Sequence, residues 1–166
     1  MTEAAERTGE FINLGILCED TVVTILNVNG ERSALVSRLI PVCPLHCSSM
    51  GKIFLSSQTE EEIKEYFRKH FQKRTQYTIA TYNEFIQEKD KIVSSGVSYD
   101  NEEYEYGLGC IAAPLYSCED KIIGAISVSG PLSRMKIKGM DSIENCIREA
   151  ANQINEKLKL AHISTM

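Results

Sequence analysis

The sequence lacks any long apolar run and any segment that resembles an export signal. No stretch reaches the ~18 consecutive apolar residues that a helix needs to cross a bilayer. The first ten residues, MTEAAERTGE, are polar and of mixed charge. Internal repeats, low-complexity tracts and linkers are also missing. We therefore expect one soluble, cytoplasmic domain without membrane contact, and 166 residues can bury a core without disulfides.

Positive charge is also scarce. The chain has 18 Lys and Arg against 23 Asp and Glu, which gives a net charge of -5. Such a chain has no broad positive field to neutralise a phosphate backbone. No segment resembles a helix-turn-helix. We therefore do not expect the chain to bind nucleic acid by itself.

Closely spaced cysteine pairs are missing as well. The six cysteines are scattered among apolar neighbours, without a Cys-x-x-Cys pair, which favours reduced thiols. Cys43, His46 and Cys47 are the densest group of metal-ligand types. A closed zinc site normally has four ligands, and no second cluster completes this group. We expect no metal site and no cofactor.

Motifs of common hydrolases and nucleotide-binding enzymes are absent. The sequence contains neither Gly-x-Ser-x-Gly nor a glycine-rich phosphate loop. A catalytic role would have to use the thiol of Cys110 or Cys47, with His46 as a base. We expect a domain that is not an enzyme. A small cysteine-dependent enzyme or redox protein is the alternative.

Strand patterns occupy both ends of the chain, with helical patterns between and after them. The predicted strands are Ile12–Cys18, Thr21–Val28, Ser33–Leu39, Val97–Asp100, Cys110–Tyr116 and Lys121–Ser129. Asn29-Gly30 favours a tight hairpin turn. The predicted helices run from Ser48 or Ser49 to Leu55, from a Thr59–Glu62 capping box, from Asn83 to Ser94 with Phe85, Ile86, Ile92 and Val93 partly periodic, and from Met140 to Leu158. This order predicts an α+β domain with a central, largely antiparallel sheet of about six strands flanked by helices.

A group of polar residues interrupts the last three predicted strands. Its members are Asp100, Cys110, Ser127 and Ser129. The apolar runs around them are typical of strands covered on both faces, so these polar groups are expected to be buried. A buried polar group without a partner costs about 1–3 kcal/mol. The group therefore predicts either an internal hydrogen-bond network or a ligand that completes one, and Ser127 and Ser129 would point to the same side of their strand.

A second candidate lies at the start of a helix. Ser48 to Lys52 leave an extended segment and open a helix, whose first N–H groups have no acceptor inside it. Such a terminus attracts a carboxylate. The alternative is that Ser48 or Ser49 only caps its own helix.

Four ordered blocks resemble one protein family. They are Pro44-Leu45-His46-Cys47-Ser48-Ser49-Met50-Gly51-Lys52, Asp100-x-Glu102-Glu103, Gly107-Leu108-Gly109-Cys110-Ile111-Ala112-Ala113-Pro114 and Ser127-Val128-Ser129-Gly130-Pro131. These blocks resemble the C-terminal, effector-binding domain of the IclR family of bacterial transcriptional regulators. The resemblance covers the chain from about Gly9 to about Leu158, and it implies a GAF-like topology.

The resemblance also implies a function. It implies a sensor of a small carboxylic acid, assembled as a homodimer or tetramer, with the ligand-binding residues Ser49, Met50, Asp100, Cys110, Ser127 and Ser129. Residues 1–10 would correspond to the end of a connecting helix or a lead segment, and residues 11–166 to the effector-binding domain. Relatives carry a winged helix-turn-helix before this domain. That domain is absent from this chain, so DNA would be bound only through it.

The polar groups also predict how the acid lies. An ionised Asp100 accepts hydrogen bonds only and repels another carboxylate. It should therefore face the far end of the ligand, where a hydroxyl or another donor is expected. Where many relatives have alanine or glycine, this chain has Ser49, which adds a donor, and the flexible Met50 can reshape the apolar wall.

Overall fold

The structure, a computed structural model, describes residues 1–30, 41–69 and 72–162. Its centre is a six-stranded antiparallel sheet in the order β3-β2-β1-β6-β5-β4. The strands are β1 Phe11–Cys18, β2 Thr21–Val28, β3 Val42–Pro44, β4 Ser98–Asn101, β5 Leu108–Tyr116 and β6 Ile122–Pro131. The helices are α1 Thr2–Thr8, α2 Ser49–Ser56, α3 Glu60–Lys69, α4 Tyr82–Ser95, α5 Leu132–Lys138 and α6 Met140–Leu160. This arrangement confirms the predicted α+β class.

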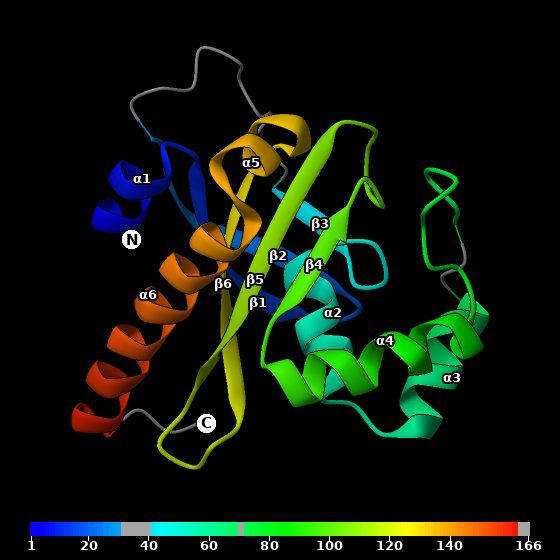
Figure 1. Cartoon of the computed structure of the whole chain (residues 1–166). Helices are drawn as coiled ribbons and strands as arrows, with labels where there is room; N and C mark the ends of the chain where they lie inside the picture. The colour runs from blue at the N-terminus through cyan, green and yellow to red at the C-terminus, as the bar shows by residue number, and fades with distance from the viewer. Residues whose placement is uncertain (31–40, 70–71, 163–166) are drawn as a thin grey trace.

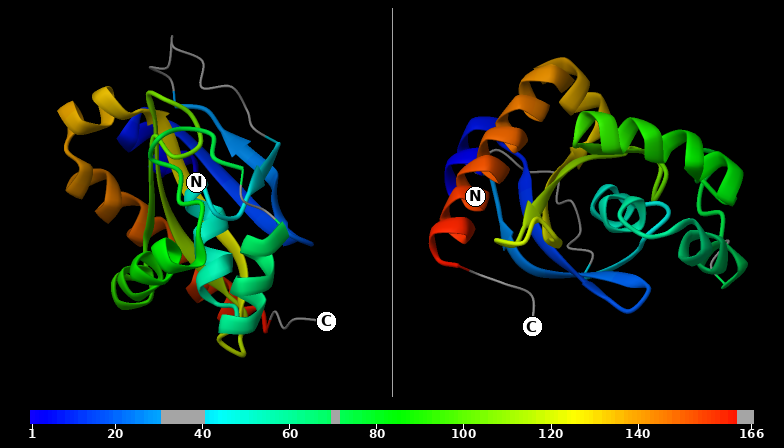
Figure 2. Two further views of the ribbon diagram at one scale, coloured as in Figure 1. Left: turned by 90° about the vertical axis from the view of Figure 1, so that its right-hand side faces the viewer. Right: turned by 90° about the horizontal axis from the view of Figure 1, so that it is seen from below.

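Helices cover both faces of the sheet. On one face α1, α5 and α6 pack on strand residues such as Ile126 and Val128. On the other face α2, α3 and α4 form a second core around Ala112 and Ala125. Figures 1 and 2 show α6 with α1 on one side of the curled sheet and α2 with α4 on the other. The prediction that β5 and β6 are covered on both faces is therefore confirmed.

Successive side chains of the central strands point to opposite faces of the sheet, so one strand contributes residues to both hydrophobic cores. In β6, Ile126 and Val128 point toward α6, so Ala125, Ser127 and Ser129 point toward α2. Polar side chains in this strand thus lie beneath α2 rather than in solvent.

Capping residues fix the helices on the α2 side. Ser48 caps α2 and accepts a hydrogen bond from the N–H of Gly51. Thr59 and Glu62 exchange hydrogen bonds at the start of α3, as the capping box predicted. A second capping box, Thr81 with Glu84, opens α4, which ends at Gly96 in a left-handed conformation.

Gly51 sets how closely α2 approaches the preceding segment. A Cβ atom at this position would lie 2.5 Å from the Cα of Leu45 and 2.5 Å from the Oγ of Ser48. Only glycine allows this contact without displacing backbone. The close approach holds the first turn of α2 against the sheet.

Some elements differ from the prediction. The predicted strand Ser33–Leu39, and the hairpin that Asn29-Gly30 would start, lie wholly or partly outside the described residues. The three-residue β3 was not predicted because it is too short for a periodic pattern. Helix α5 was not predicted either, because it follows β6 directly at Pro131 without a polar break. Val93, which belongs to the partly periodic apolar pattern of α4, is 66% exposed.

Among the described helices, none is both long and apolar enough to span a bilayer.

Candidate functional site

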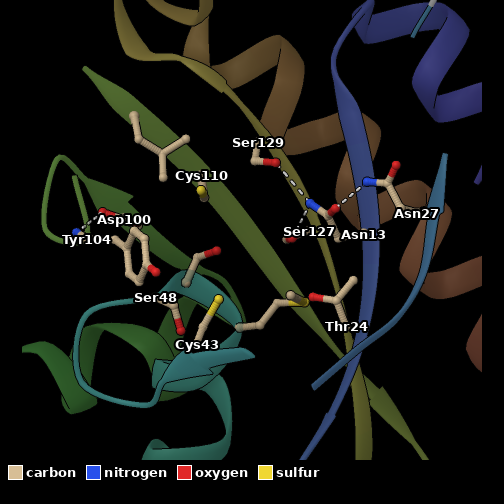
Figure 3. Close-up of a pocket in the computed structure, with 13 residues that line it drawn as sticks. Asn13, Thr24, Asn27, Cys43, Ser48, Asp100, Tyr104, Cys110, Ser127 and Ser129 are labelled. Atoms are coloured by element: carbon tan, nitrogen blue, oxygen red, sulfur yellow. Dashed lines mark hydrogen bonds between the residues drawn. The ribbon is translucent and has the colours of Figure 1, made fainter. Parts of the chain in front are cut away.

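A polar cavity lies between the sheet and the first turn of α2 (Figure 3). Its volume is about 50 Å³. One water molecule needs about 10–15 Å³ of such space, so the cavity has room for a molecule of a few heavy atoms. The described residues that line it are Asn13, Thr24, Asn27, Cys43, Ser48, Ser49, Met50, Asp100, Tyr104, Leu108, Cys110, Ser127 and Ser129. All six residues predicted from the sequence are among them.

Strand register brings the predicted polar residues of the sheet together. Cys110 of β5 pairs with Asp100 of β4 on one side and with Ser129 of β6 on the other. Asn13 of β1 pairs with Ser127 of β6. Because paired residues in antiparallel strands point to the same face, their side chains form one polar surface beneath α2.

A chain of hydrogen bonds orients the two serines. Asn27 donates to Asn13 Oδ1 at 2.6 Å. The Asn13 amide in turn donates to Ser129 Oγ at 2.9 Å and to Ser127 Oγ at 3.4 Å. Figure 3 shows this chain running from β2 through β1 to β6. Since each serine oxygen accepts from Asn13, its own hydroxyl proton is left to donate to a further acceptor.

A bulge turns β2 toward the cavity. The register between β1 and β2 shifts after Leu14, where Leu14 pairs with Leu26 but Gly15 pairs with Thr24. In a regular strand, Thr24 and Asn27 would point to opposite faces because they are three residues apart. The extra residue, Ile25, lets both line the cavity.

The first turn of α2 forms the opposite wall. Ser48 has a capping role, since it accepts from Gly51 N–H and donates to the carbonyl of Pro44. The capping alternative is therefore correct for Ser48. Ser49 and Met50 follow it at the tip of the helix, both buried and both lining the cavity. Backbone N–H groups at this position have no acceptor within the helix.

Asp100 has one satisfied and one unsatisfied carboxylate oxygen. Its Oδ1 accepts from the backbone N–H groups of Glu103 at 2.7 Å and Tyr104 at 3.3 Å. Its Oδ2 is buried and has no hydrogen-bond partner among the described residues. Burial, and then the negative charge of Glu103, raise the pKa of Asp100 to about 7. The sequence-based prediction treats Asp100 as ionised, whereas this raised pKa favours a partly protonated carboxyl near neutral pH.

A buried ion pair lies behind Asp100. Lys52 of α2, with a fully buried side chain, contacts Glu103 at 2.7 Å and Glu88 of α4 at 3.4 Å. This contact ties the segment after β4 to α2. The Arg74 guanidinium lies 3.9 Å from the ring centre of Tyr104 and donates to the carbonyl of Tyr104. Tyr104 is thereby held over the cavity.

The thiols around the cavity are poor nucleophiles. Burial, followed by the charge of Asp100, raises the pKa of Cys110 well above its ordinary value and raises the pKa of Cys43 and of Cys47 to about 12. Catalytic thiols have lowered values instead. His46 does not line the cavity, and its ring nitrogens contact Tyr66 Oη and the carbonyl of Gln72. The catalytic alternative thus lacks an activated nucleophile at this cavity.

Metal-ligand types are not grouped around the cavity either. Within residues 1–30, 41–69 and 72–162, no group of three or more His, Cys, Asp or Glu side chains is placed to hold a metal ion.

Several residues of the cavity were not recognised in the sequence. They are Asn13, Thr24, Asn27, Cys43, Tyr104 and Leu108. Asn13 gave the best available signal, because it is the one strongly polar residue in the otherwise apolar strand Phe11–Cys18. It could not be separated from an ordinary solvent-facing residue without the pairing of β1 with β6.

Comparison with known proteins identifies similar domains. Residues 1–156 match the family model described as Bacterial transcriptional regulator IclR C-terminal. The HTH-type transcriptional regulator KdgR of Dickeya chrysanthemi is 31% identical over 160 residues, which are 95% of this chain and 52% of that protein. The DNA-binding transcriptional repressor YiaJ of Escherichia coli K12 is 31% identical over 156 residues, which are 91% of this chain and 55% of that protein.

Solved structures agree with these matches. The crystal structure of transcriptional regulator YaiJ has a TM-score of 0.91 at 30% identity and covers 99% of this chain and 94% of that one. The C-terminal domain of Escherichia coli KdgR has a TM-score of 0.82 at 28% identity, with 96% and 93% covered.

The chain spans just over half the length of the two curated relatives. Both carry the names of transcriptional regulators, which agrees with the prediction that this domain is not an enzyme.

Proposed function

Because the chain belongs to the IclR family of bacterial transcriptional regulators, and residues 1–156 match the C-terminal domain of that family, we propose that the cavity beneath α2 binds a small carboxylic acid as effector. The domain then acts as a sensor that controls an attached DNA-binding domain. Its ligand-binding residues are Ser49, Met50, Asp100, Cys110, Ser127 and Ser129. The hydrogen-bond chain from Asn27 through Asn13 orients Ser127 and Ser129.

The observation that carries this proposal is the convergence of neutral donors on one cavity. Ser127 and Ser129 accept from Asn13 and retain their hydroxyl protons. The tip of α2 faces the same space with the partial positive charge of a helix N-terminus. No Lys, Arg or His is among the described lining residues. A carboxylate held by such donors needs no cationic partner.

The opposite end of the cavity supports a second polar group on the ligand. Asp100 and Cys110 lie on adjacent strands, and Tyr104 and Leu108 line the cavity with them. The PobR inducer-binding domain, at 23% identity, is described as a complex with 3-hydroxybenzoic acid, which combines a carboxyl with a hydroxyl. That likeness concerns the fold alone. We propose a small acid with a hydroxyl or oxo group beyond its carboxylate.

We propose that the domain is part of a longer, DNA-binding regulator. Residues 1–10 would adjoin a preceding winged helix-turn-helix domain, and residues 11–166 would form the sensing domain. DNA would be bound through the attached domain, in a cytoplasmic homodimer or tetramer. An effector changes DNA binding only if it binds two quaternary arrangements with different affinity.

The test is a paired substitution with a matched control. Ser127→Ala with Ser129→Ala should weaken binding of a small acid, because a hydrogen bond to a charged group contributes about 1.5–3 kcal/mol, or about tenfold or more in affinity for each hydroxyl. Calorimetry with a panel of 2-oxo and hydroxy acids would measure the loss. Ser56→Ala is the control, since Ser56 is a buried serine that donates to the carbonyl of Ile53 away from the cavity.

Two results would contradict the proposal. Unchanged affinity in a folded double variant would remove the serines from the site. If NMR showed that the protein converts the bound acid to a product, the cysteine-dependent enzyme would be favoured instead.

A further inference from the structure

The cavity contains a buried acidic group, Asp100, which lies beside the buried carboxyl of Glu103. Asp100 is 1% exposed, and its Oδ2 has no partner among the described residues although the side chain lines the cavity. An anion bound here would share a small, water-poor space with a second carboxyl group. Charge repulsion is strong in such surroundings because little solvent screens it.

The groups around Asp100 offer no surplus positive charge. Glu103 lies beside it in the segment after β4. Among the described residues, the buried cation nearby is Lys52 of α2, which is already paired with Glu103 and with Glu88 of α4. From β5 and β3, the thiols of Cys110 and Cys43 face the same space in neutral form.

Arg74 is a further cation near this end, and it is not among the described residues that line the cavity. Its guanidinium contacts the Tyr104 ring and donates to the carbonyl of Tyr104. Glu88 is also paired with Lys91 at 3.6 Å, so the two lysines balance the two glutamates and leave no surplus positive charge for Asp100.

We propose that the cavity binds its acid together with one proton, which is taken from solvent and held on Oδ2 of Asp100. This inference rests on the proposed acid-binding function. The proton removes the repulsion between the two carboxyl groups. It also turns an orphaned acceptor into a donor that can bind an oxo group of the ligand.

The geometry suits a protonated side chain. Oδ1 keeps its two backbone donors, which a neutral carboxyl still accepts. Burial and Glu103 already raise the pKa of Asp100 to about 7, and a bound anion would raise it further. Above neutral pH the unliganded site is mostly ionised, so binding there must draw a proton.

Calorimetry in two buffers measures this proton directly. Pyruvate, an acid whose second group only accepts hydrogen bonds, is titrated into the protein at pH 6 and pH 8.5, in buffers with small and large ionisation enthalpies. We expect uptake of close to one proton per pyruvate at pH 8.5 and a small fraction at pH 6. Affinity should fall about tenfold for each pH unit above neutrality, as proton linkage requires.

Asp100→Asn is the matched variant, because its amide oxygen can still accept the N–H groups of Glu103 and Tyr104. The enthalpy of pyruvate binding to this variant should not depend on the buffer, and its affinity for pyruvate should stay constant across the same pH range. Lactate serves as a second probe, since its hydroxyl can donate to an ionised Asp100. Lactate should therefore take up less proton than pyruvate.

The possible results distinguish proton uptake by Asp100 from acid binding itself. Saturable pyruvate binding with no proton uptake at pH 8.5 would overturn the inference and leave the acid site intact. Equal uptake by wild type and Asp100→Asn would place the proton elsewhere and overturn it as well. Failure of the folded wild-type protein to bind either acid at any pH would overturn the acid site, and the inference with it.

Discussion

Asp100 should also make the unliganded domain sensitive to pH. Its pKa lies at about 7 in the folded protein against an ordinary value of 3.8. Between these values the folded chain holds a proton that the unfolded chain has lost, so stability falls as pH rises from about 4 to 7 and levels off above. A rise in pKa of this size corresponds to about 4 kcal/mol.

Urea unfolding at pH 5, 6, 7 and 8 would test this expectation. The unfolding free energy of wild type should decline across this range relative to Asp100→Asn, whose side chain does not titrate. Parallel curves for the two proteins would show that Asp100 ionises as readily in the folded state as in the unfolded chain.

Lys52 gives a second prediction at the scale of one residue. Its ammonium is fully buried against Glu103, so Lys52→Met would leave the glutamate without its closest partner. Breaking a buried ion pair from one side costs about 3–5 kcal/mol. Adding Glu103→Leu to Lys52→Met should recover part of this loss, and a double-mutant cycle by urea unfolding measures the coupling. Strict additivity of the two changes would contradict the pairing.

Individual site residues could be predicted from the sequence where their neighbours in the chain carried the signal. Ser127 and Ser129 were found because a two-residue spacing in an apolar run fixes their common side. Asn13, Asn27 and Thr24 were missed because their roles depend on which strands are neighbours and on a bulge in β2. The raised pKa of Asp100 could not be predicted because it depends on burial in three dimensions.

At the scale of elements, the end of β6 is fixed by a buried ion cluster. Glu10 has no solvent exposure, and its carboxylate accepts two hydrogen bonds from Arg134 and one from Lys138. Gly130 of β6 packs directly on this carboxylate. A Cβ atom at Gly130 would lie 2.3 Å from Glu10 Oε2.

Gly130→Ala should therefore destabilise the domain, by about 1–3 kcal/mol as in other overpacked cores. Gly124→Ala in the same strand is the matched control, because a Cβ there would meet its nearest neighbour at 3.5 Å, an ordinary contact. Thermal unfolding of both variants measures the difference. Equal stability of the two would mean that the Glu10 cluster moves aside without cost.

Helices were predicted where either a capping signal or a long periodic pattern was present. Helix α3 begins with a capping box, whereas α6 has a long periodic pattern and no side-chain cap. The short β3 and α5 have neither, since each depends on contacts with neighbours for its stability.

At the scale of the molecule, the domain should associate with itself but not with DNA. Its net charge is -5. Large apolar side chains remain exposed on β1, β2 and β3, namely Ile16, Leu17, Ile25, Leu26 and Val42. Exposed apolar patches mark interaction surfaces. Light scattering should give a mass at least twice that of one chain, and residues 1–166 alone should show no specific DNA binding at physiological salt. A monomer that binds operator DNA unaided would contradict the proposed sensor role.

The position of Gly130 has a mechanical consequence. Ser129 lines the cavity, and the next residue rests on the Glu10 carboxylate, whose partner Lys138 also binds the last carbonyl of α1 at Thr8. A residue that lines the cavity and a residue that packs on the Glu10 cluster are thus neighbours in β6. We expect any displacement of β6 at the cavity to reach the Glu10 cluster and, through Lys138, the end of α1.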